Sequence, residues 1–221
     1  MIILEFDELH KKLKKHLDDQ SENWNSFVYA KKLGFYQGFD EIGVEGCRPT
    51  EKRFSRYHIE KYLSKTQNAL DIGCNCGFLT IYISRLISHI DGVEINPYLV
   101  NIANDTSDFL KVTNTTFYSS SFEDYNTENK YDVIFSLAND ETIDGNTKFS
   151  FKEYVDKILN LLNDEGYLMF ETVSPDTYEP RLFEPKLQIL SSVFTILDDI
   201  MVESEYPLNV PERRFLVLRK K

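Results

Sequence analysis

From Asn68 onward, the sequence alternates short apolar runs with amphipathic stretches. Alternation of this kind is typical of α/β proteins, in which helices connect the parallel strands of one sheet. The apolar runs that we expect to form strands cover residues 69–72, 90–95, 116–119, 133–137, 167–172, 195–202 and 215–218. Helices are expected between most of them, and the clearest apolar stripes at helical spacing cover residues 78–88, 97–110 and 150–163.

The connection between the last two expected strands differs from the others. It is a short stretch around the turn-rich segment YPLNVPE, whereas a parallel crossover is longer and usually helical. These two strands should therefore pair in antiparallel fashion. The sequence predicts a Rossmann-like, mostly parallel sheet of seven strands, with an antiparallel last strand and helices on both faces.

The residues before this alternation have a different pattern. Residues 4–17 place leucines about four positions apart with lysines between them, which predicts an amphipathic helix whose lysines face solvent. Residues 34–50 are rich in glycine and turn formers, so we expect an ordered loop there. A further helix is expected over residues 50–63. We therefore predict an N-terminal helical extension with a lid-like loop at 1–49 and one catalytic domain at 50–221.

The composition excludes several classes of protein. Lys and Arg total 25 against 36 Asp and Glu, a net charge of −11 that works against binding the nucleic-acid backbone. No apolar run approaches the roughly 20 residues of a membrane-spanning helix, and the N-terminus lacks the pattern of a signal peptide, so we expect a cytoplasmic protein. Cys74 and Cys76 have no second Cys or His pair downstream, so no metal site is expected.

The most informative segment is ALDIGCNCGFLTIYI, an expected strand, a loop and a helix. Its Asp71, Gly73 and Gly77 have the spacing D-x-G-x-x-x-G, and such glycines let the backbone approach a ligand at the start of a helix. Any tight strand-to-helix turn could also use two glycines. Glu94, however, ends the next apolar run about 20 residues further on, where a carboxylate can accept hydrogen bonds from both ribose hydroxyls. A dinucleotide-binding loop needs a glycine two positions after Gly73, and its absence favours a nucleoside without a pyrophosphate.

Together, the loop, the acid after the second strand and the closing hairpin resemble the class I S-adenosylmethionine-dependent methyltransferases over residues 48–221. The resemblance implies S-adenosylmethionine as the cofactor, with S-adenosylhomocysteine as its product. The donor-binding positions that it implies are Asp71, Gly73, Cys74, Asn75, Gly77, Glu94, Ile95, Leu99, Ser121, Phe122, Glu123 and Leu137. The family often has an acid at the position of Ser121, so the adenine amine contact could come instead from Glu123, Asp124 or the backbone.

A narrower resemblance rests on the extension, where Tyr36-Gln37 is followed by the segment GCRPT and then by Arg53. This pattern is similar to the methyltransferase part of bacterial O-antigen chain-terminating kinase–methyltransferases and related surface-polysaccharide enzymes. It implies that Tyr36, Gln37 and Arg53 close over the donor. Simple packing of Tyr36, and a solvated helix face for the arginines, are the alternatives.

The acceptor side depends on the chemistry of the acceptor atom. A neutral hydroxyl must lose a proton, whereas a phosphate is already ionised and needs arginines to position its oxygens. The candidate catalytic residues are His58, Asp140 and Glu141, and the candidate acceptor ligands are Arg48, Arg56, Asn139 and Arg181. A structural role for His58, and a capping or solvated role for Asp140 and Glu141, remain open alternatives.

The sequence leads to one main hypothesis and three alternatives. The main hypothesis is O-methylation of a sugar, or of a phosphate-type group attached to one, in bacterial surface polysaccharide (capsule or O-antigen) biosynthesis. The alternatives are an N- or O-methyltransferase of a small amine or carboxylate metabolite, a non-catalytic S-adenosylmethionine-binding partner subunit, and a nicotinamide oxidoreductase. We expect a small-molecule or glycan acceptor as the partner rather than a nucleic acid.

Overall fold

A seven-stranded sheet forms the centre of the molecule in the computed structural model, which describes residues 2–29, 31, 34–141, 147–207 and 209–221. Its strand order is β5-β4-β3-β6-β7-β9-β8. The strands are β3 (Asn68–Ile72), β4 (His89–Glu94), β5 (Thr115–Ser119), β6 (Tyr131–Leu137), β7 (Leu162–Glu171), β8 (Phe194–Glu203) and β9 (Glu212–Lys220). The pairs from β5 to β7 are parallel, and β9 runs antiparallel to both β7 and β8. The predicted mostly parallel sheet with an antiparallel last strand is confirmed.

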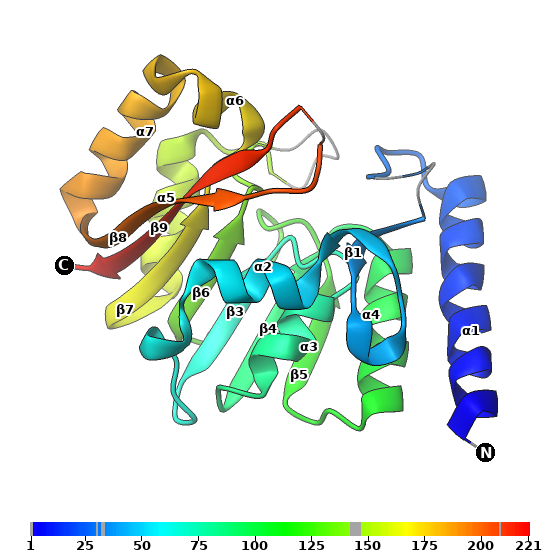
Figure 1. Cartoon of the computed structure of the whole chain (residues 1–221). Coiled ribbons are helices and arrows are strands. Elements are labelled where there is room, and N and C mark those ends of the chain that lie inside the picture. Colours follow the sequence, from blue (N-terminus) through cyan, green and yellow to red (C-terminus); the bar gives the residue numbers. More distant parts are fainter. Residues whose placement is uncertain (1, 30, 32–33, 142–146, 208) are drawn as a thin grey trace.

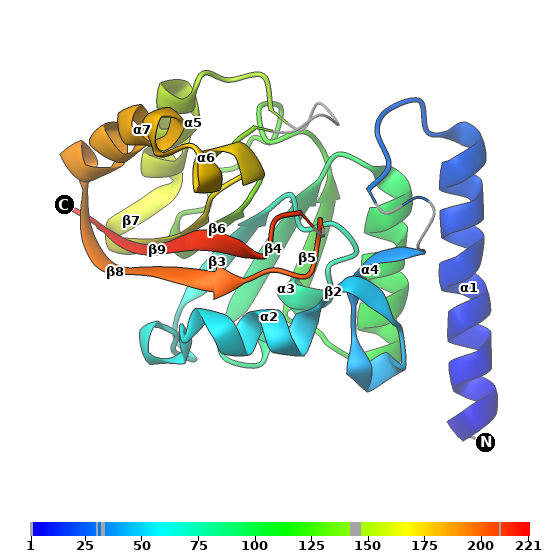
Figure 2. The same ribbon diagram turned by 45° about the horizontal axis from the view of Figure 1, so that its top comes forward.

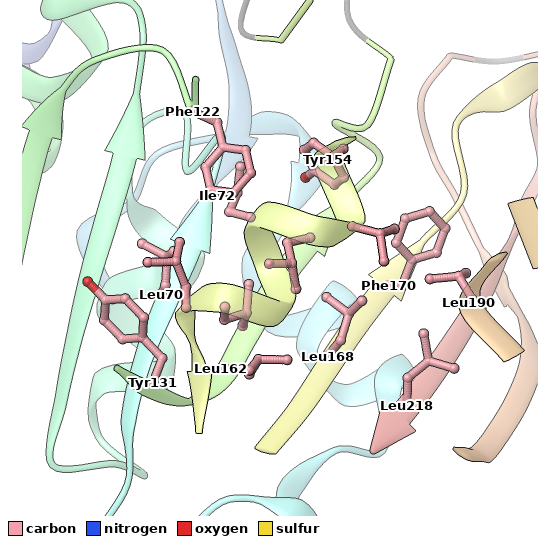
Figure 3. Packing of buried hydrophobic residues seen from close by; sticks show 14 of the residues in the cluster. Leu70, Ile72, Phe122, Tyr131, Tyr154, Leu162, Leu168, Phe170, Leu190 and Leu218 are labelled. Carbon is pink, nitrogen blue, oxygen red and sulfur yellow. The ribbon is translucent and has the colours of Figure 1, made fainter. Parts of the chain in front are cut away.

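Helices cover both faces of this sheet (Figure 1). On one face lie α2 (Thr50–Tyr57), α3 (Phe78–Ser84) and α4 (Pro97–Leu110), and on the other lie α5 (Phe151–Leu161), α6 (Ser174–Tyr178) and α7 (Pro180–Val193). Figure 3 shows how buried side chains from the sheet, such as Ile72 and Leu168, pack under α5. The two apolar layers fix the sheet between the helices and leave the ends of its strands for polar side chains.

Two helix starts have clear local causes. Asn96 caps α4 by accepting a hydrogen bond from Tyr98 N at 3.0 Å, and Pro97 occupies the first turn, where its missing N–H costs nothing. Ser150 and Glu153 form a reciprocal capping box at the start of α5. These caps place both helices directly after loops that contribute to the site.

The N-terminal helix α1 (Ile2–Asn23) lies along α4 in both ribbon views (Figure 2). Leu9 and Leu13 are buried between the two helices. Lys12 Nζ and His16 Nε2 reach Asp105 of α4 at 3.1 and 2.9 Å, and the ion pair of Lys12 is solvent-exposed and therefore weak. Burial of the apolar stripe thus supplies most of the attachment of α1 to the domain.

Three expectations about individual elements need correction. Residues 34–50 form two short parallel strands, β1 (Phe35–Gly38) and β2 (Gly46–Pro49), around a 3₁₀ turn, because their apolar side chains are buried against α3. The helix expected over 50–63 ends at Tyr57, since His58 takes a left-handed conformation with φ of 51°. Helices α6 and α7 occupy a stretch where no particular helix was expected.

The part of the chain that the structure describes contains no helix of the length and apolarity that crossing a membrane requires.

Candidate functional site

A cavity opens where β3, β4 and β6 end, and we call it the central cavity. Its lining includes nine of the predicted donor-binding residues and one predicted acceptor ligand. These are Tyr36, Gln37, Arg53, Asp71, Gly73, Cys74, Asn75, Glu94, Leu137 and Asn139. Residues from the extension and from three strands therefore meet at the carboxyl edge of the sheet, where ligands bind in open α/β sheets.

The loop after β3 owes its shape to two glycines with left-handed backbones. Gly73 has φ of 66°, and a side chain there would place its Cβ 2.9 Å from Asn139 Nδ2. Gly77 has φ of 70°, and its Cβ would lie 2.6 Å from the Cβ of Ala103 on α4. Gly73 N donates to Val93 O at 2.8 Å, which holds the loop against the end of β4. Any larger residue would move this loop away from the cavity floor.

Glu94 ends β4 with its carboxylate buried and oriented by backbone groups. Asn75 N donates to Glu94 Oε2 at 3.0 Å, and Asn96 N donates to Glu94 Oε1 at 2.9 Å. The side chain is 5% exposed. A carboxylate has about four lone-pair sites, and one held in this orientation suits the recognition of a diol.

Asp71 ends β3 deeper in the cavity. Thr80 Oγ1 donates to Asp71 Oδ2 at 2.5 Å. Burial raises the pKa of Asp71 to about 6, although the Thr80 hydrogen bond and the charge of Arg53 act in the opposite direction. At neutral pH the group is largely ionised and supplies a negative charge beside the cavity.

Gln37 connects the extension to the glycine loop. Its Nε2 donates to Cys74 O at 3.2 Å, and its Oε1 accepts from Phe78 N at 3.0 Å. The second bond satisfies a backbone N–H in the first turn of α3, which has no partner within the helix. Strand β1 is therefore attached to the floor of the central cavity through one buried amide.

A buried ionic group beside the cavity was missed by sequence reasoning, and its centre is Glu171 at the end of β7. Arg48 Nη1 and Nη2 donate to its two carboxylate oxygens at 2.8 and 3.1 Å, and the hydroxyl of Tyr57 donates to Oε2. Arg53 and Arg213 each approach Glu171 to 3.5 Å.

The surroundings of Glu171 determine its ionisation. Burial alone would raise the pKa of this fully buried carboxyl, but the charges of Arg48, Arg53 and Arg213 hold it well below its usual range. One signal in the sequence could have revealed the residue, because Glu171 ends an expected strand in the same way as Asp71 and Glu94 do. We call Glu171, Arg48, Arg53 and Arg213 together the Glu171 group.

A second cavity of about 390 Å³, the outer cavity, adjoins the central one. Tyr29, Tyr36 and Ala138 line both cavities, so the two meet at these residues. Tyr36 contacts the ring of Tyr29 at 5.5 Å and that of Tyr206 at 5.7 Å between centroids. Glu141 and Arg213 are the charged residues that line the outer cavity among those described.

Several predicted acceptor residues lie elsewhere. His58 is exposed at the end of α2, and Arg181 is exposed on α7. Arg56 forms ion pairs with Glu203 and Glu205. Arg48 is 1% exposed and lies under the cavities, bound to Glu171, rather than on a solvated helix face.

Asp140 follows Asn139 in the loop after β6 and is bound by a lysine of α7. Lys186 Nζ lies 2.7 Å from each of Asp140 Oδ2, Glu141 Oε1 and Asp176 Oδ2. Burial raises the pKa of Asp140 to about 6, although Lys186 lowers it. The candidate bases Asp140 and Glu141 are therefore held in an ionic cluster with Lys186.

The predicted adenine-binding segment after β5 lies outside both cavities. Phe122 is fully buried in the apolar layer under α5 (Figure 3), and Ser121 bonds to Asp124. Glu123 Oε1 accepts from Thr147 Oγ1 at 3.3 Å. By contrast, Ile95 and Leu99 line a narrow cavity beside the central one, which we call the lateral cavity.

The chemistry of the central cavity fits S-adenosylmethionine. Asn75 Oδ1 and Arg53 Nη2 are buried and have no hydrogen-bond partner among the described residues. They offer an acceptor and a donor beside the carboxylates of Asp71 and Glu94. The cavity encloses about 60 Å³, well below the ~300 Å³ at which drug-sized ligands are usually held. Tyr29 and Tyr36 also line the neighbouring lateral and outer cavities, into which a larger ligand can extend.

Comparison with known structures shows the same fold. The N-methyltransferase NodS from Bradyrhizobium japonicum in complex with S-adenosyl-L-homocysteine matches with a TM-score of 0.59 and 14% identity, over 96% of this chain and 98% of that one. A methyltransferase from Pyrococcus furiosus matches with a TM-score of 0.60 and 12% identity, over 96% and 97% of the two chains. At these identities the match is one of fold.

Sequence comparison identifies related enzymes. The chain is 31% identical over 116 residues to malonyl-[acyl-carrier protein] O-methyltransferase 1 of Ilyobacter polytropus, covering 52% of this chain and 41% of the relative. The corresponding enzyme of Bacillus cereus is 28% identical over 112 residues, covering 50% and 39%. The match spans about two fifths of the length of these relatives.

The family model described as a methyltransferase domain matches residues 63–205, which include the glycine loop, Glu94 and Glu171. The match covers more than half of the chain. The chain therefore belongs to this methyltransferase domain family.

Proposed function

We propose that this enzyme methylates an anionic oxygen, of a phosphate or a carboxylate, on a sugar or another small molecule. The observation that carries the proposal is the Glu171 group, in which three buried guanidinium groups share one carboxylate. Arg53 of this group lines the central cavity, and Arg213 lines the outer cavity. Positive charge is thus available where an acceptor would approach the methyl donor.

The geometry of the Glu171 group leaves this charge incompletely balanced. Both oxygens of Glu171 accept short hydrogen bonds from Arg48, while Arg213 Nε lies 3.5 Å away. Thr172 O and the hydroxyls of Ser174 and Ser204 accept the other bonds of the Arg213 guanidinium. These neutral partners satisfy the N–H groups without neutralising the charge, so an anion in the outer cavity would be stabilised.

The same arrangement suits methyl transfer without a general base. The donor supplies an electrophilic methyl group on its sulfonium, and an ionised acceptor oxygen is already nucleophilic at neutral pH. The protein then has to align the two across the junction at Tyr29, Tyr36 and Ala138. The placement of His58 outside the cavities and of Asp140 in the Lys186 cluster agrees with this chemistry.

Two further observations support the acceptor class. The relatives are named as O-methyltransferases of a malonyl carrier, and a malonyl thioester carries one free carboxylate. The rings of Phe27, Tyr29, Tyr36 and Tyr206 line the outer cavity and offer flat apolar surfaces to a sugar ring or a carbon chain.

The setting that we propose is bacterial surface polysaccharide assembly. Tyr36, Gln37 and Arg53 carry the resemblance to surface-polysaccharide methyltransferases, and all three line the central cavity. Together with the arginine of the outer cavity, they support a phosphate-bearing sugar as the acceptor. A carboxylate acceptor is the second candidate, which the named relatives favour.

The test follows label from methyl-labelled S-adenosylmethionine into phosphorylated sugars, malonyl thioesters, neutral sugars and amines. Phosphatase treatment before the reaction removes phosphate acceptors, and mild base after it releases methanol from carboxyl methyl esters. Labelling that is lost after either treatment supports an anionic oxygen. Labelling of neutral sugars or amines that survives both treatments contradicts it.

Substitution of Arg213 provides the matching test on the protein. We expect Arg213→Met to raise the acceptor KM by about 10- to 100-fold, the effect of losing charged hydrogen bonds of ~1.5–3 kcal/mol, while the Kd for S-adenosylhomocysteine is retained. Arg214→Met is the matched control, because the adjacent Arg214 pairs with Asp199 on the surface. An unchanged acceptor KM in Arg213→Met would remove Arg213 from the acceptor site.

A further inference from the structure

The C-terminal end of α1 lies beside the loops that hold the donor. The lateral cavity separates them and is lined by Gln20 and Trp24 of the extension together with Asn75, Glu94 and Leu99 of the domain. Asn75, Glu94 and Tyr36 line the central cavity as well, so the two cavities adjoin at these residues. The extension therefore contributes to the wall on the side of Glu94.

The chemistry of this wall matches one part of the donor. Glu94 supplies a carboxylate for two hydroxyl groups, and Ile95 and Leu99 supply apolar surface for the face of a base. The indole Nε1 of Trp24 is buried and has no hydrogen-bond partner among the described residues. Buried indole N–H groups usually find an acceptor, so this donor is suited to a ligand that enters the lateral cavity.

The position of Trp24 is fixed by its connection to α1 and by the packing of α1 on α4. Its backbone N donates to Gln20 O at 2.9 Å, which continues the helical pattern beyond the end of α1. Leu13 is fully buried between α1 and α4, and His16 Nε2 lies 2.9 Å from Asp105 of α4. Helix α4 begins directly after Glu94 and Asn96, so one rigid connection joins the donor carboxylate to the indole.

We infer that α1 is part of the donor site and that Trp24 Nε1 donates a hydrogen bond to the adenosine half of S-adenosylmethionine. The acceptor is a ring nitrogen of the base or an oxygen of the ribose, since both are hydrogen-bond acceptors next to Glu94. Gln20, which is 3% exposed, closes the same wall. This inference concerns the donor alone and is independent of the acceptor proposed above.

Trp24 is the single tryptophan of the chain, which makes it a direct reporter. Titration of the wild-type protein with S-adenosylhomocysteine should change the indole emission with the same Kd that calorimetry gives. Adenosine should change it as well, whereas homocysteine should not. An unchanged emission in a sample that binds S-adenosylhomocysteine by calorimetry would overturn the inference.

Removal of the N–H alone tests the hydrogen bond. Trp24→Phe keeps an aromatic ring and should weaken S-adenosylhomocysteine binding by about 5- to 10-fold. Tyr62→Phe is the matched control, since it removes a ring-borne donor that bonds Asp198 away from the cavities, and it should leave the affinity unchanged. Wild-type affinity in folded Trp24→Phe would overturn the assignment of Nε1 as a ligand.

Discussion

Asp71 is a buried carboxyl of the central cavity whose ionisation changes near neutral pH. Burial raises its pKa to about 6. The ionised form attracts the positively charged sulfonium and ammonium groups of S-adenosylmethionine, and the protonated form does not. We therefore expect donor affinity to fall as the pH drops through about 6, measured as the calorimetric Kd between pH 5 and 8. Asp71→Asn should bind more weakly at pH 8 with little pH dependence, and a retained pH dependence in this variant would assign the effect to another group.

Glu171 affects stability more than any single surface charge, because it balances three buried cations. We expect Glu171→Gln to lower the free energy of unfolding by about 3–5 kcal/mol, the usual effect of leaving buried charges without their partner. Urea denaturation at neutral pH measures this. Glu165→Gln on the same strand is the control, since it removes an exposed carboxylate whose ion pair with Arg219, at 3.4 Å, is at the surface. The free energy of unfolding of this variant should stay within about 0.5 kcal/mol of the wild-type value.

The pH dependence of stability gives a second readout for Glu171. Its pKa in the folded state lies below the ordinary value near 4.3. Its contribution to the free energy of unfolding is therefore complete above about pH 4.3 and is lost as the pH falls below it. Wild-type stability should therefore decline below about pH 4 more steeply than that of Glu171→Gln. Parallel pH profiles for the two proteins would contradict the assignment.

At the scale of elements, Lys186 joins α7 to the loop after β6 and to α6, both of which contribute residues to the outer cavity. Without its ammonium group, the buried carboxylates of Asp140 and Asp176 face each other with no cation between them. We expect Lys186→Met to lose about 3–5 kcal/mol of stability at pH 8.

This loss should be smaller at low pH. The pKa of Asp140 is already raised to about 6 in the folded protein. A carboxyl group whose pKa is raised by folding stabilises the folded state below its pKa in the unfolded chain, and this stabilisation is lost as the pH rises through the folded-state pKa. The Tm of Lys186→Met should therefore be higher at pH 5 than at pH 8, and Lys152→Met, which removes an exposed i,i+4 pair, should resemble the wild type. A Tm for Lys186→Met that does not increase toward low pH would contradict a role for Asp140 protonation.

The strands of the main sheet could be predicted because interior parallel strands bury both faces, so their sequences are continuous apolar runs. The glycine loop and Glu94 could be predicted because their spacing is local. The strands β1 and β2 could not, because four-residue strands with glycine and proline carry little periodic signal. The end of α2 was also hidden, since nothing in the local sequence shows that His58 adopts positive φ.

The rest of the site depends on contacts between distant parts of the chain. Arg48 and Glu171 are separated by 123 positions, and no spacing rule connects them. Trp24 and Asn75 line the same cavity because α1 packs on α4. Sequence reasoning therefore identified the residues that follow single strands, and the family resemblance added Tyr36, Gln37 and Arg53. Glu171, Arg213 and Trp24 were missed, because only contacts between distant elements bring them to the site.

At the scale of the whole molecule, the donor site draws on the extension, α2 and the sheet, so donor binding should stabilise the complete fold. S-adenosylhomocysteine at 100 times its Kd should add about 2.7 kcal/mol. For a chain of this length, that corresponds to an increase in Tm of roughly 5–10 °C, which a thermal unfolding scan measures. Glu94→Ala should lose most of the increase at the same ligand concentration, while Glu128→Ala, at an exposed position, should keep it. No increase in the wild type would show that the ligand does not distinguish folded from unfolded chains.

Tyr29 and Tyr36 form the wall that the central and outer cavities share. A donor in the central cavity and an acceptor in the outer cavity would both contact this wall. We therefore expect the two ligands to be energetically coupled. Thermodynamic linkage makes such coupling reciprocal, so the factor by which the donor alters acceptor affinity is the factor by which the acceptor alters donor affinity. Calorimetric titrations of the acceptor and of S-adenosylhomocysteine, each with and without the other, should therefore give the same factor in both directions.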